Sequence, residues 1–258
     1  MKRRQACGLA IALSMSLAAV VSNVAASTQE PESMSTQTSA SNISETLDAR
    51  QRAIVPIAAH AAAGDMDDLR EALNQGLDAG MTVSDAREVL VQLYAYAGFP
   101  RSLNALGELM KVLEKRKQSG TQDEPGSEPS RDIPEGKALL DAGTANQTKL
   151  SGAPVKGPLF EFAPAIDEYL KTHLFGDIFE RDNLDWQSRE LATVSMLAAL
   201  QGAEAQLQAH MRIGMNVGLT QQQLRQLADV LADRVDAQSA QRAREALERQ
   251  LAIAKPGN

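Results

Sequence analysis

The sequence predicts an all-α protein built from two tandem helical repeats. Strong helix formers such as Ala, Leu, Gln and Glu are plentiful, whereas aromatic residues make up only 3 % of the 258-residue chain. Hydrophobic residues account for 43 %, which is enough for a sizeable core. The helical patterns of the two halves also match each other along much of their length. Duplication of a helical unit predicts two similar bundles related by a pseudo-twofold axis.

Residues 1–26 have the organisation of a secretory signal peptide. A cationic start precedes an apolar run from Gly8 to Val21, and small residues prepare a cleavage site after Ala26. This run is too short to span a membrane, and no later run approaches the roughly 18 apolar residues that a spanning helix needs. We therefore expect a periplasmic or secreted protein without a membrane span. Cleavage would remove Cys7, the only cysteine of the chain.

Residues 27–45 are rich in Ser, Thr and Gln and predict a disordered tether. The first repeat follows at 46–116. Gly64 and Gly80 can adopt the left-handed conformation that ends a helix, and Thr82 can cap the next one. This pattern predicts four helices, at about 48–63, 66–79, 83–97 and 100–116.

Residues 117–160 predict a linker or an extended excursion. Gly, Pro, Ser and charged residues dominate its first half, and the second half shows no clear helical period. The second repeat is expected at 161–254. Its pattern predicts helices at about 164–173, 186–201, 203–217, 221–233 and 237–253.

The two repeats differ at the positions that matter most for chemistry. Arg52 matches Arg189 at an offset of 137 residues, and from Gly64 and Gly202 onward the offset is 138. Glu190 then corresponds to Ala53 and His210 to Ala72, so only the second repeat holds both polar residues. In return, the segment Tyr96–Pro100 of the first repeat is matched by 234–238, which has a different sequence. The pattern predicts one composite site per chain, with His210 and Glu190 from one half and Tyr94 or Tyr96 from the other.

Three segments resemble the carboxymuconolactone decarboxylase-like family, an all-helical superfamily that also includes AhpD-type alkylhydroperoxidases. They are EVLVQLYAYAGFPRSLNAL at 88–106, RELATVSMLAAL at 189–200 and QAHMRIGMNVGLT at 208–220. The resemblance implies two tandem AhpD-like helical-bundle repeats and no organic cofactor. It also implies a homo-oligomer, a trimer or hexamer, in which a two-repeat chain stands in for two subunits.

The resemblance further implies roles for particular residues. AhpD-type members carry a CxxC pair just before the family histidine, and the matching positions here are Ala203 and Gln206. Without a thiolate there is no nucleophile for a thiol peroxidase. The decarboxylase-like branch is thought to use a histidine and a glutamate, with an arginine for the substrate carboxylate. The matching residues are His210, Glu190 and Arg189.

Each candidate also has a structural explanation. His210 borders an apolar helical stripe, Glu190 lies near a helix start where the dipole favours a carboxylate, and Arg189 could form a salt bridge between subunits. His173, at a helix end, is a further candidate for lining the cleft. The histidines do not have the spacing of a ligand set, so we predict no metal, and we expect His60 to pack or cap.

Two functions remain compatible with these residues. The first is a cofactor-free decarboxylase, isomerase or lactone-acting enzyme on a small organic acid, in which His210 transfers a proton, Glu190 tunes it, and Arg189 or a tyrosine holds the anion. The second is a non-catalytic oligomeric protein that binds a small molecule or serves as a scaffold. The net charge of -7 provides no basic face for nucleic acid.

Overall fold

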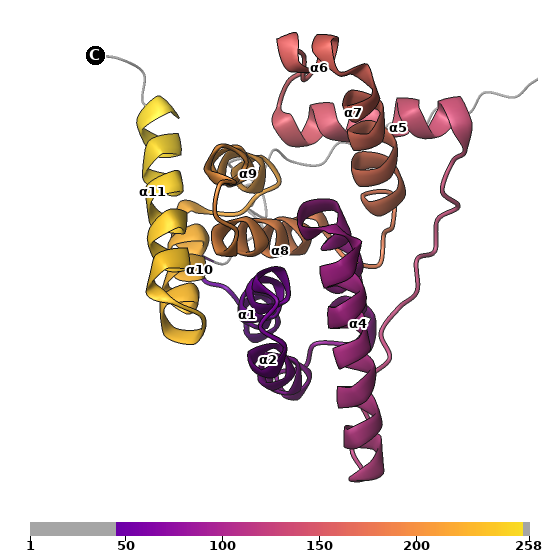
Figure 1. The fold of residues 1–258 in the computed structure, drawn as a ribbon, viewed down its shortest axis with the longest axis vertical. Helices are drawn as coiled ribbons and strands as arrows, with labels where there is room; N and C mark the ends of the chain where they lie inside the picture. The colour runs from indigo at the N-terminus through magenta and orange to yellow at the C-terminus, as the bar shows by residue number, and fades with distance from the viewer. Residues whose placement is uncertain (1–44, 255–258) are drawn as a thin grey trace, which may run out of the picture. The chain divides into compact units, whose positions relative to one another are not determined.

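The computed structural model describes residues 45–254. The predicted signal peptide at 1–26, and all but the last residue of the tether predicted at 27–45, lie outside this range. Within it every regular element is a helix, which confirms the predicted fold class (Figure 1). No helix of this part of the chain combines the length and the hydropathy that a membrane crossing requires.

The first repeat contains four helices, α1 (Ala49–Ala63), α2 (Met66–Asp78), α3 (Val83–Gln92) and α4 (Tyr94–Gln118). Thr82 caps α3 in a capping box with Asp85, as the sequence suggested. The predicted break at Gly98 is confirmed: its φ of 81° and ψ of 160° are not helical, so α4 consists of two helical stretches joined at a kink there. The helix α3 ends before this kink, at Gln92, and Leu93, whose own φ and ψ are helical, leads into Tyr94.

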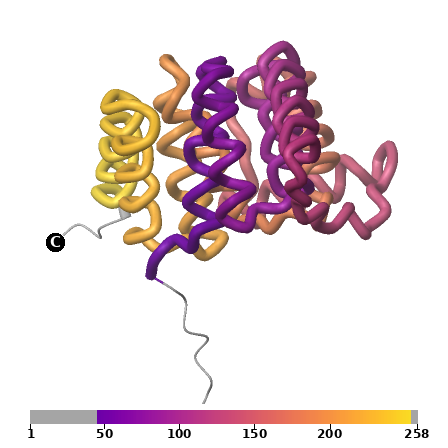
Figure 2. Tube along the Cα trace, turned by 90° about the horizontal axis from the view of Figure 1, so that it is seen from below, coloured from indigo at the N-terminus to yellow at the C-terminus, as the bar shows by residue number. Residues whose placement is uncertain are grey.

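The second repeat supplies α8 (Trp186–Ala199), α9 (Glu204–Asn216), α10 (Gln221–Arg234) and α11 (Ala237–Ala254). Its internal packing repeats that of the first. The pairs α1–α2, α3–α4 and α2–α4 have as counterparts α8–α9, α10–α11 and α9–α11. In the ribbon of Figure 1 and the Cα tube of Figure 2, α10 and α11 lie on one side of α1, and α4 lies on the other. This correspondence is what a pseudo-twofold relation between the repeats requires.

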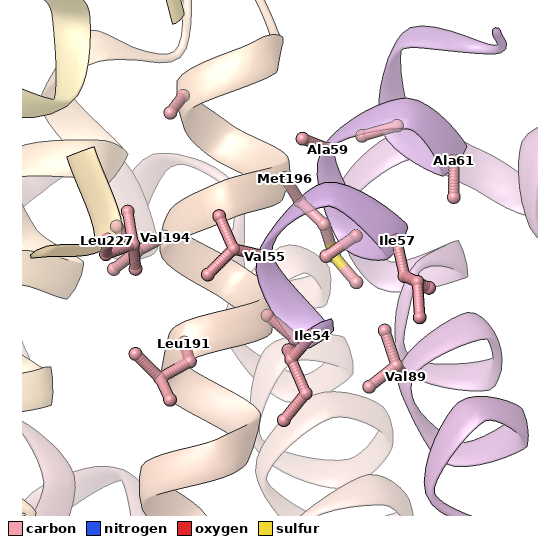
Figure 3. Packing of buried hydrophobic residues seen from close by; sticks show 14 of the residues in the cluster. Ile54, Val55, Ile57, Ala59, Ala61, Val89, Leu191, Val194, Met196 and Leu227 are labelled. Carbon is pink, nitrogen blue, oxygen red and sulfur yellow. The ribbon is translucent and has the colours of Figure 1, made fainter. Parts of the chain in front are cut away.

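The two repeats share one hydrophobic core. The largest helix contact of the described residues joins α1 to α8, which occupy equivalent places in the two repeats. Ile54 and Val55 of α1 lie among Leu191 and Val194 of α8 in this contact (Figure 3). All four residues are fully buried. Because burial of apolar surface is the main stabilising term, neither repeat is expected to fold without the other.

The segment between the repeats is more ordered than its sequence suggests. Residues predicted as extended form α5 (Gly136–Ser151), followed by α6 (Pro158–Phe162), α7 (Pro164–Tyr169) and the π-helix η1 (Leu170–Ile178). The prediction failed because α5 buries only a narrow stripe, and two of the three residues in it, Gly143 and Gln147, are not apolar. The helix predicted at 164–173 is in fact α7 continuing into η1.

A second, smaller cluster of buried side chains joins this segment to the rest of the protein. It contains Leu150 of α5, Phe175 of η1 and Ile213 of α9, among others, and Tyr94 and Tyr96 of α4 pack against it. Between α4 and α5, the chain has no regular structure but crosses the start of α3, where the carbonyls of 124 and 125 accept two of its first N–H groups. The segment thereby packs beside α9 and the start of α4.

Candidate active site around His210

A hydrogen bond between His210 and Glu190 forms the centre of the candidate site. Helices α8 and α9 make a hairpin whose connection turns at Gly202, with a φ of 81°. Across this hairpin His210 Nδ1 lies 2.7 Å from Glu190 Oε2. The Glu190 side chain exposes no surface, and the imidazole exposes 10 % of its own. The two residues that the sequence singled out as catalytic candidates therefore form a buried dyad.

In each residue of the dyad, one polar side-chain atom takes no part in the hydrogen bond between the two residues. Glu190 Oε1 is buried and makes no hydrogen bond with the protein. On the imidazole, Nε2 is the nitrogen that does not face Glu190. An ionised carboxylate can only accept, so it holds Nδ1 as the protonated nitrogen and leaves Nε2 with a lone pair. This arrangement can accept a proton at Nε2 and stabilise the imidazolium that results.

Tyr96 brings the first repeat to the dyad. Its ring meets the imidazole of His210 edge-on, with ring centroids 5.7 Å apart and planes at 81°. Burial, and then the charge of Glu190, raise the pKa of the Tyr96 phenol far above its ordinary value, although Thr193 and Arg189 oppose the change. Tyr96 therefore stays protonated at neutral pH and can act only as a neutral hydrogen-bonding group.

Tyr94, at the start of α4, and His173, in η1, belong to a separate group of side chains. Tyr94 stacks on Phe99, with ring centroids 4.6 Å apart. His173 Nδ1 lies 3.0 Å from Asp177 Oδ2, and both side chains are exposed. Burial raises the pKa of Tyr94, and the charge of Asp177 adds to the effect. Tyr94 and His173 thus both lie near Asp177, and neither has a described contact with His210.

Arg189 has a different role from the one that the resemblance implies. Its side chain is fully buried and forms an ion pair with Glu88 of α3, Nη2 to Oε2 at 3.2 Å. The same guanidinium donates to the Arg181 carbonyl and to Gln92 Oε1. A group with no exposed surface and a resident carboxylate cannot also hold a substrate carboxylate, so we withdraw Arg189 from the substrate-binding residues.

Glu88 and Gln92 are residues that the sequence analysis missed. Glu88 also accepts from the Arg181 guanidinium, and Gln92 Nε2 donates to the Arg189 carbonyl and the Thr193 hydroxyl. They stand four residues apart in α3, the spacing that puts two side chains on one face of a helix. That spacing of two polar residues on a buried face was a signal available in the sequence. Their network fixes α3 against α8 directly beside Glu190.

The dyad is poorly suited to hold a metal by itself. It offers one imidazole nitrogen and one carboxylate, whereas a catalytic zinc site has three protein ligands.

The structure also describes the two positions at which AhpD-type members carry their cysteines. Ala203 is the residue before α9 and Gln206 lies in its first turn, so the place of the thiol pair is taken by side chains without a nucleophile.

The fold and the dyad define an all-α tandem-repeat protein with a buried histidine–glutamate pair in its second repeat. The chain belongs to the carboxymuconolactone decarboxylase family, which matches residues 33–110 and 164–249, more than half of its length. The two matched regions correspond to the two repeats. A search of curated proteins gave no match to the chain.

Proposed function

We propose that this protein is a cofactor-free proton-transfer enzyme that acts on a small organic acid or lactone, as a decarboxylase, isomerase or lactone-acting enzyme. The observation that carries the proposal is the 2.7 Å contact between His210 Nδ1 and the fully buried Glu190 carboxylate. Folding buries this polar pair although the first repeat folds with Ala53 and Ala72 in its place. Packing alone therefore gives no reason for the pair.

In the proposed mechanism, His210 is the general base and acid. Nε2 removes a proton from a carbon next to a substrate carbonyl, and the electron pair of that C–H bond moves into an enolate. Glu190 stabilises the imidazolium through Nδ1–H, and Nε2 then returns the proton to the intermediate at another position. In a decarboxylation no C–H proton is removed first: the bond between the carbon and the carboxylate breaks, its electron pair moves into the enolate as carbon dioxide leaves, and Nε2, protonated beforehand by water, gives its proton to that carbon. A positioned base of this kind contributes about 10²–10⁴-fold to a rate.

Tyr96 is the group that we assign to the substrate oxygen. Its neutral phenol lies edge-on to the imidazole and can donate a hydrogen bond to the enolate oxygen. With Arg189 held by Glu88, this hydrogen bond would carry the stabilisation that the family resemblance gives to an arginine. We retain Tyr94 and His173 as outer contacts for the substrate, because Tyr94 packs with Tyr96 against the smaller buried cluster and His173 lies in η1, which contributes to that cluster.

A binding protein without catalysis is the second candidate. The observation in its favour is the small exposure of His210, which is 8 % as a residue, under the ring of Tyr96. A substrate would have to displace part of this cover to reach Nε2. A protein that only holds a small apolar acid, or serves as an oligomeric scaffold, would need no such access.

The deciding experiment compares turnover of a panel of lactones and β-keto acids by wild type, His210→Ala and Glu190→Gln. Lys137→Ala serves as the control, because this basic residue also pairs with a carboxylate, Asp141, but lies on the surface and has no role in the proposed site. We expect both dyad variants to lose at least tenfold in kcat while the control keeps its activity. Equal turnover by wild type and His210→Ala would remove the histidine from the mechanism. Binding without turnover in wild type would favour the second candidate.

We also propose that the chain forms a homotrimer. Helix α4 carries three large exposed apolar side chains, Phe99, Leu103 and Met110, spaced so that they follow one face. Coverage by a second copy would remove this surface from water. Light scattering after size exclusion measures the assembly, and Leu103→Glu is expected to shift it towards monomer.

Export to the periplasm or the medium completes the proposal. An exported chain that loses its only cysteine with the signal peptide would work without a thiol, as proton transfer at His210 does. Sequencing of the N-terminus of the protein recovered from the producing cells tests this location. We expect the mature chain to begin at Ser27.

A further inference from the structure

The first repeat has a pocket where the second repeat has its histidine. Ala72, which corresponds to His210, lines this pocket, and so does Arg234, which corresponds to Tyr96. Its volume is about 380 Å³. The small alanine leaves space that an imidazole would fill, and residues of α1, α2 and the end of α10 line it. The internal symmetry therefore places an open pocket in the first repeat at the position that the dyad histidine fills in the second.

His60 of α1 lines this pocket with an unpaired nitrogen. The residue is only 6 % exposed, and its Nε2 lies 3.0 Å from the carbonyl oxygen of Arg234. Because a carbonyl can only accept, Nε2 carries the hydrogen, and the neutral ring keeps its lone pair on Nδ1. That Nδ1 is buried and has no hydrogen-bond partner in the protein. A buried nitrogen of this kind is normally satisfied by a water molecule or a bound ion.

Two carboxylates lie beside this nitrogen. The chain turns at Gly64, whose φ of 87° ends α1, and the turn brings Asp65 back to the ring, with Oδ2 4.0 Å from Nδ1. Asp68 follows in the first turn of α2, and one ligand atom from each of the three residues lies within 4.8 Å of the others. The expectation that His60 only packs or caps therefore missed its acidic neighbours. They lie close in sequence, but only the turn directs them at the ring.

We propose that His60, Asp65 and Asp68 bind a divalent transition-metal ion, and we take Zn²⁺ as the representative ion. An imidazole nitrogen and two carboxylate oxygens are a ligand set that zinc accepts, and bonds of about 2.0–2.2 Å place tetrahedral ligands about 3.4 Å apart. The two aspartates are exposed, so their side chains can rotate inward to reach that spacing. Three protein ligands leave the fourth position of a tetrahedral ion to water or to a small anion.

The surroundings of His60 suit a cation in two further ways. Its Nε2–H donates to a backbone carbonyl, which is the outer contact that orients metal-bound histidines and makes them more basic. The pocket lining is also acidic, with Asp68, Glu71 and Asp233 against the single cation Arg234. Carboxylates of this number attract a divalent ion and help to retain it. The competing explanation is a protonated His60 that forms an ion pair with Asp65 and needs no metal.

The test uses the purified protein after treatment with a chelator. Co²⁺ is added while its visible absorption is followed, and Zn²⁺ is titrated by calorimetry. We expect one ion per chain, with cobalt bands typical of a four-coordinate site and displacement of Co²⁺ by Zn²⁺. Asp65→Asn and Asp68→Asn should each weaken binding at least tenfold without loss of fold, because both side chains are exposed. His60→Gln should abolish binding.

The controls use the two other histidines of the chain. His173→Gln removes the exposed pair with Asp177, and His210→Gln removes the dyad, so both variants should bind the ion as wild type does. Should wild type take up no stoichiometric ion, the ion-pair explanation of His60 holds and the proposal fails. Binding that is lost in His173→Gln or His210→Gln but kept in Asp68→Asn would also overturn it. Circular dichroism of each variant separates lost binding from lost fold.

Discussion

Glu88 of α3 and Arg189 of α8 form an ion pair in which neither side chain exposes any surface. The pair crosses from one repeat to the other, and its carboxylate also accepts from Arg181. One buried anion therefore faces two guanidinium groups, Arg181 being partly exposed and Arg189 fully buried. The pair adjoins Glu190, so it also bears on how the candidate site is held.

The two ends of this pair should not be equally costly to remove. Glu88→Gln leaves Arg189 buried without a countercharge, and we expect a loss of about 3–5 kcal/mol in unfolding free energy. Arg189→Met leaves Glu88 neutralised by Arg181, so the loss should be nearer to about 1–3 kcal/mol. Urea denaturation of both variants measures the difference. A larger loss for Arg189→Met would show that Arg181 does not neutralise the carboxylate.

Glu88 should also make the stability depend on pH. Burial pushes its pKa up, but the hydrogen bond from Arg181 and the charge of Arg189 more than offset this, so its pKa lies below the ordinary value of 4.5. A carboxyl with a lowered pKa in the folded state stabilises the protein fully above its unfolded pKa, and this contribution is lost as the pH falls through the folded pKa. The gap in stability between wild type and Glu88→Gln should therefore shrink below about pH 4.5. Urea titrations at pH 7, 5 and 3 measure it, and a gap that widens towards pH 3 would contradict the assignment.

Gly143 should be a position at which alanine is not tolerated. A Cβ there would overlap the backbone carbonyl of Lys171, because α5 and η1 approach each other at this point. Alanine in place of a helical glycine normally stabilises by up to about 1 kcal/mol. Gly107→Ala in α4, whose Cβ would meet nothing within 4 Å, is the matched control and should show that gain. We expect Gly143→Ala to lower the Tm and to expose 136–178 to proteolysis. Similar Tm values for the two variants would mean that the close approach is unimportant.

Tyr96→Phe should separate stability from function. The phenol oxygen is buried without a hydrogen bond of normal geometry, so its removal should change the unfolding free energy by less than about 0.5 kcal/mol. If Tyr96 holds the substrate oxygen, kcat should fall while the fold is unchanged. Thermal melts and the lactone panel measure the two effects. A stability loss well above 1 kcal/mol would reveal a structural hydrogen bond to the phenol instead.

The repeat pattern and the helix ends were readable from the sequence because they depend on neighbours in the chain. Capping needs only residues three apart in the chain: Thr82 caps α3 with Asp85, as predicted, and Thr220 caps α10 with Gln223 in the same way. The helix α5 was not predicted, because it depends on packing against residues far away in the chain. Gly143 of α5 is buried because η1 lies against it.

The candidate site, like the fold, was predictable from the sequence only in part. The sequence alone indicated the family and the two repeats, and it singled out His210 and Glu190 as candidates because their counterparts in the first repeat are alanines. Tertiary structure decided the partners. It joined those two residues at 2.7 Å, gave Arg189 to Glu88, and turned Asp65 toward His60. Helical periodicity tells which face a side chain is on, but the element that packs against that face follows from the burial of apolar surface across the whole chain.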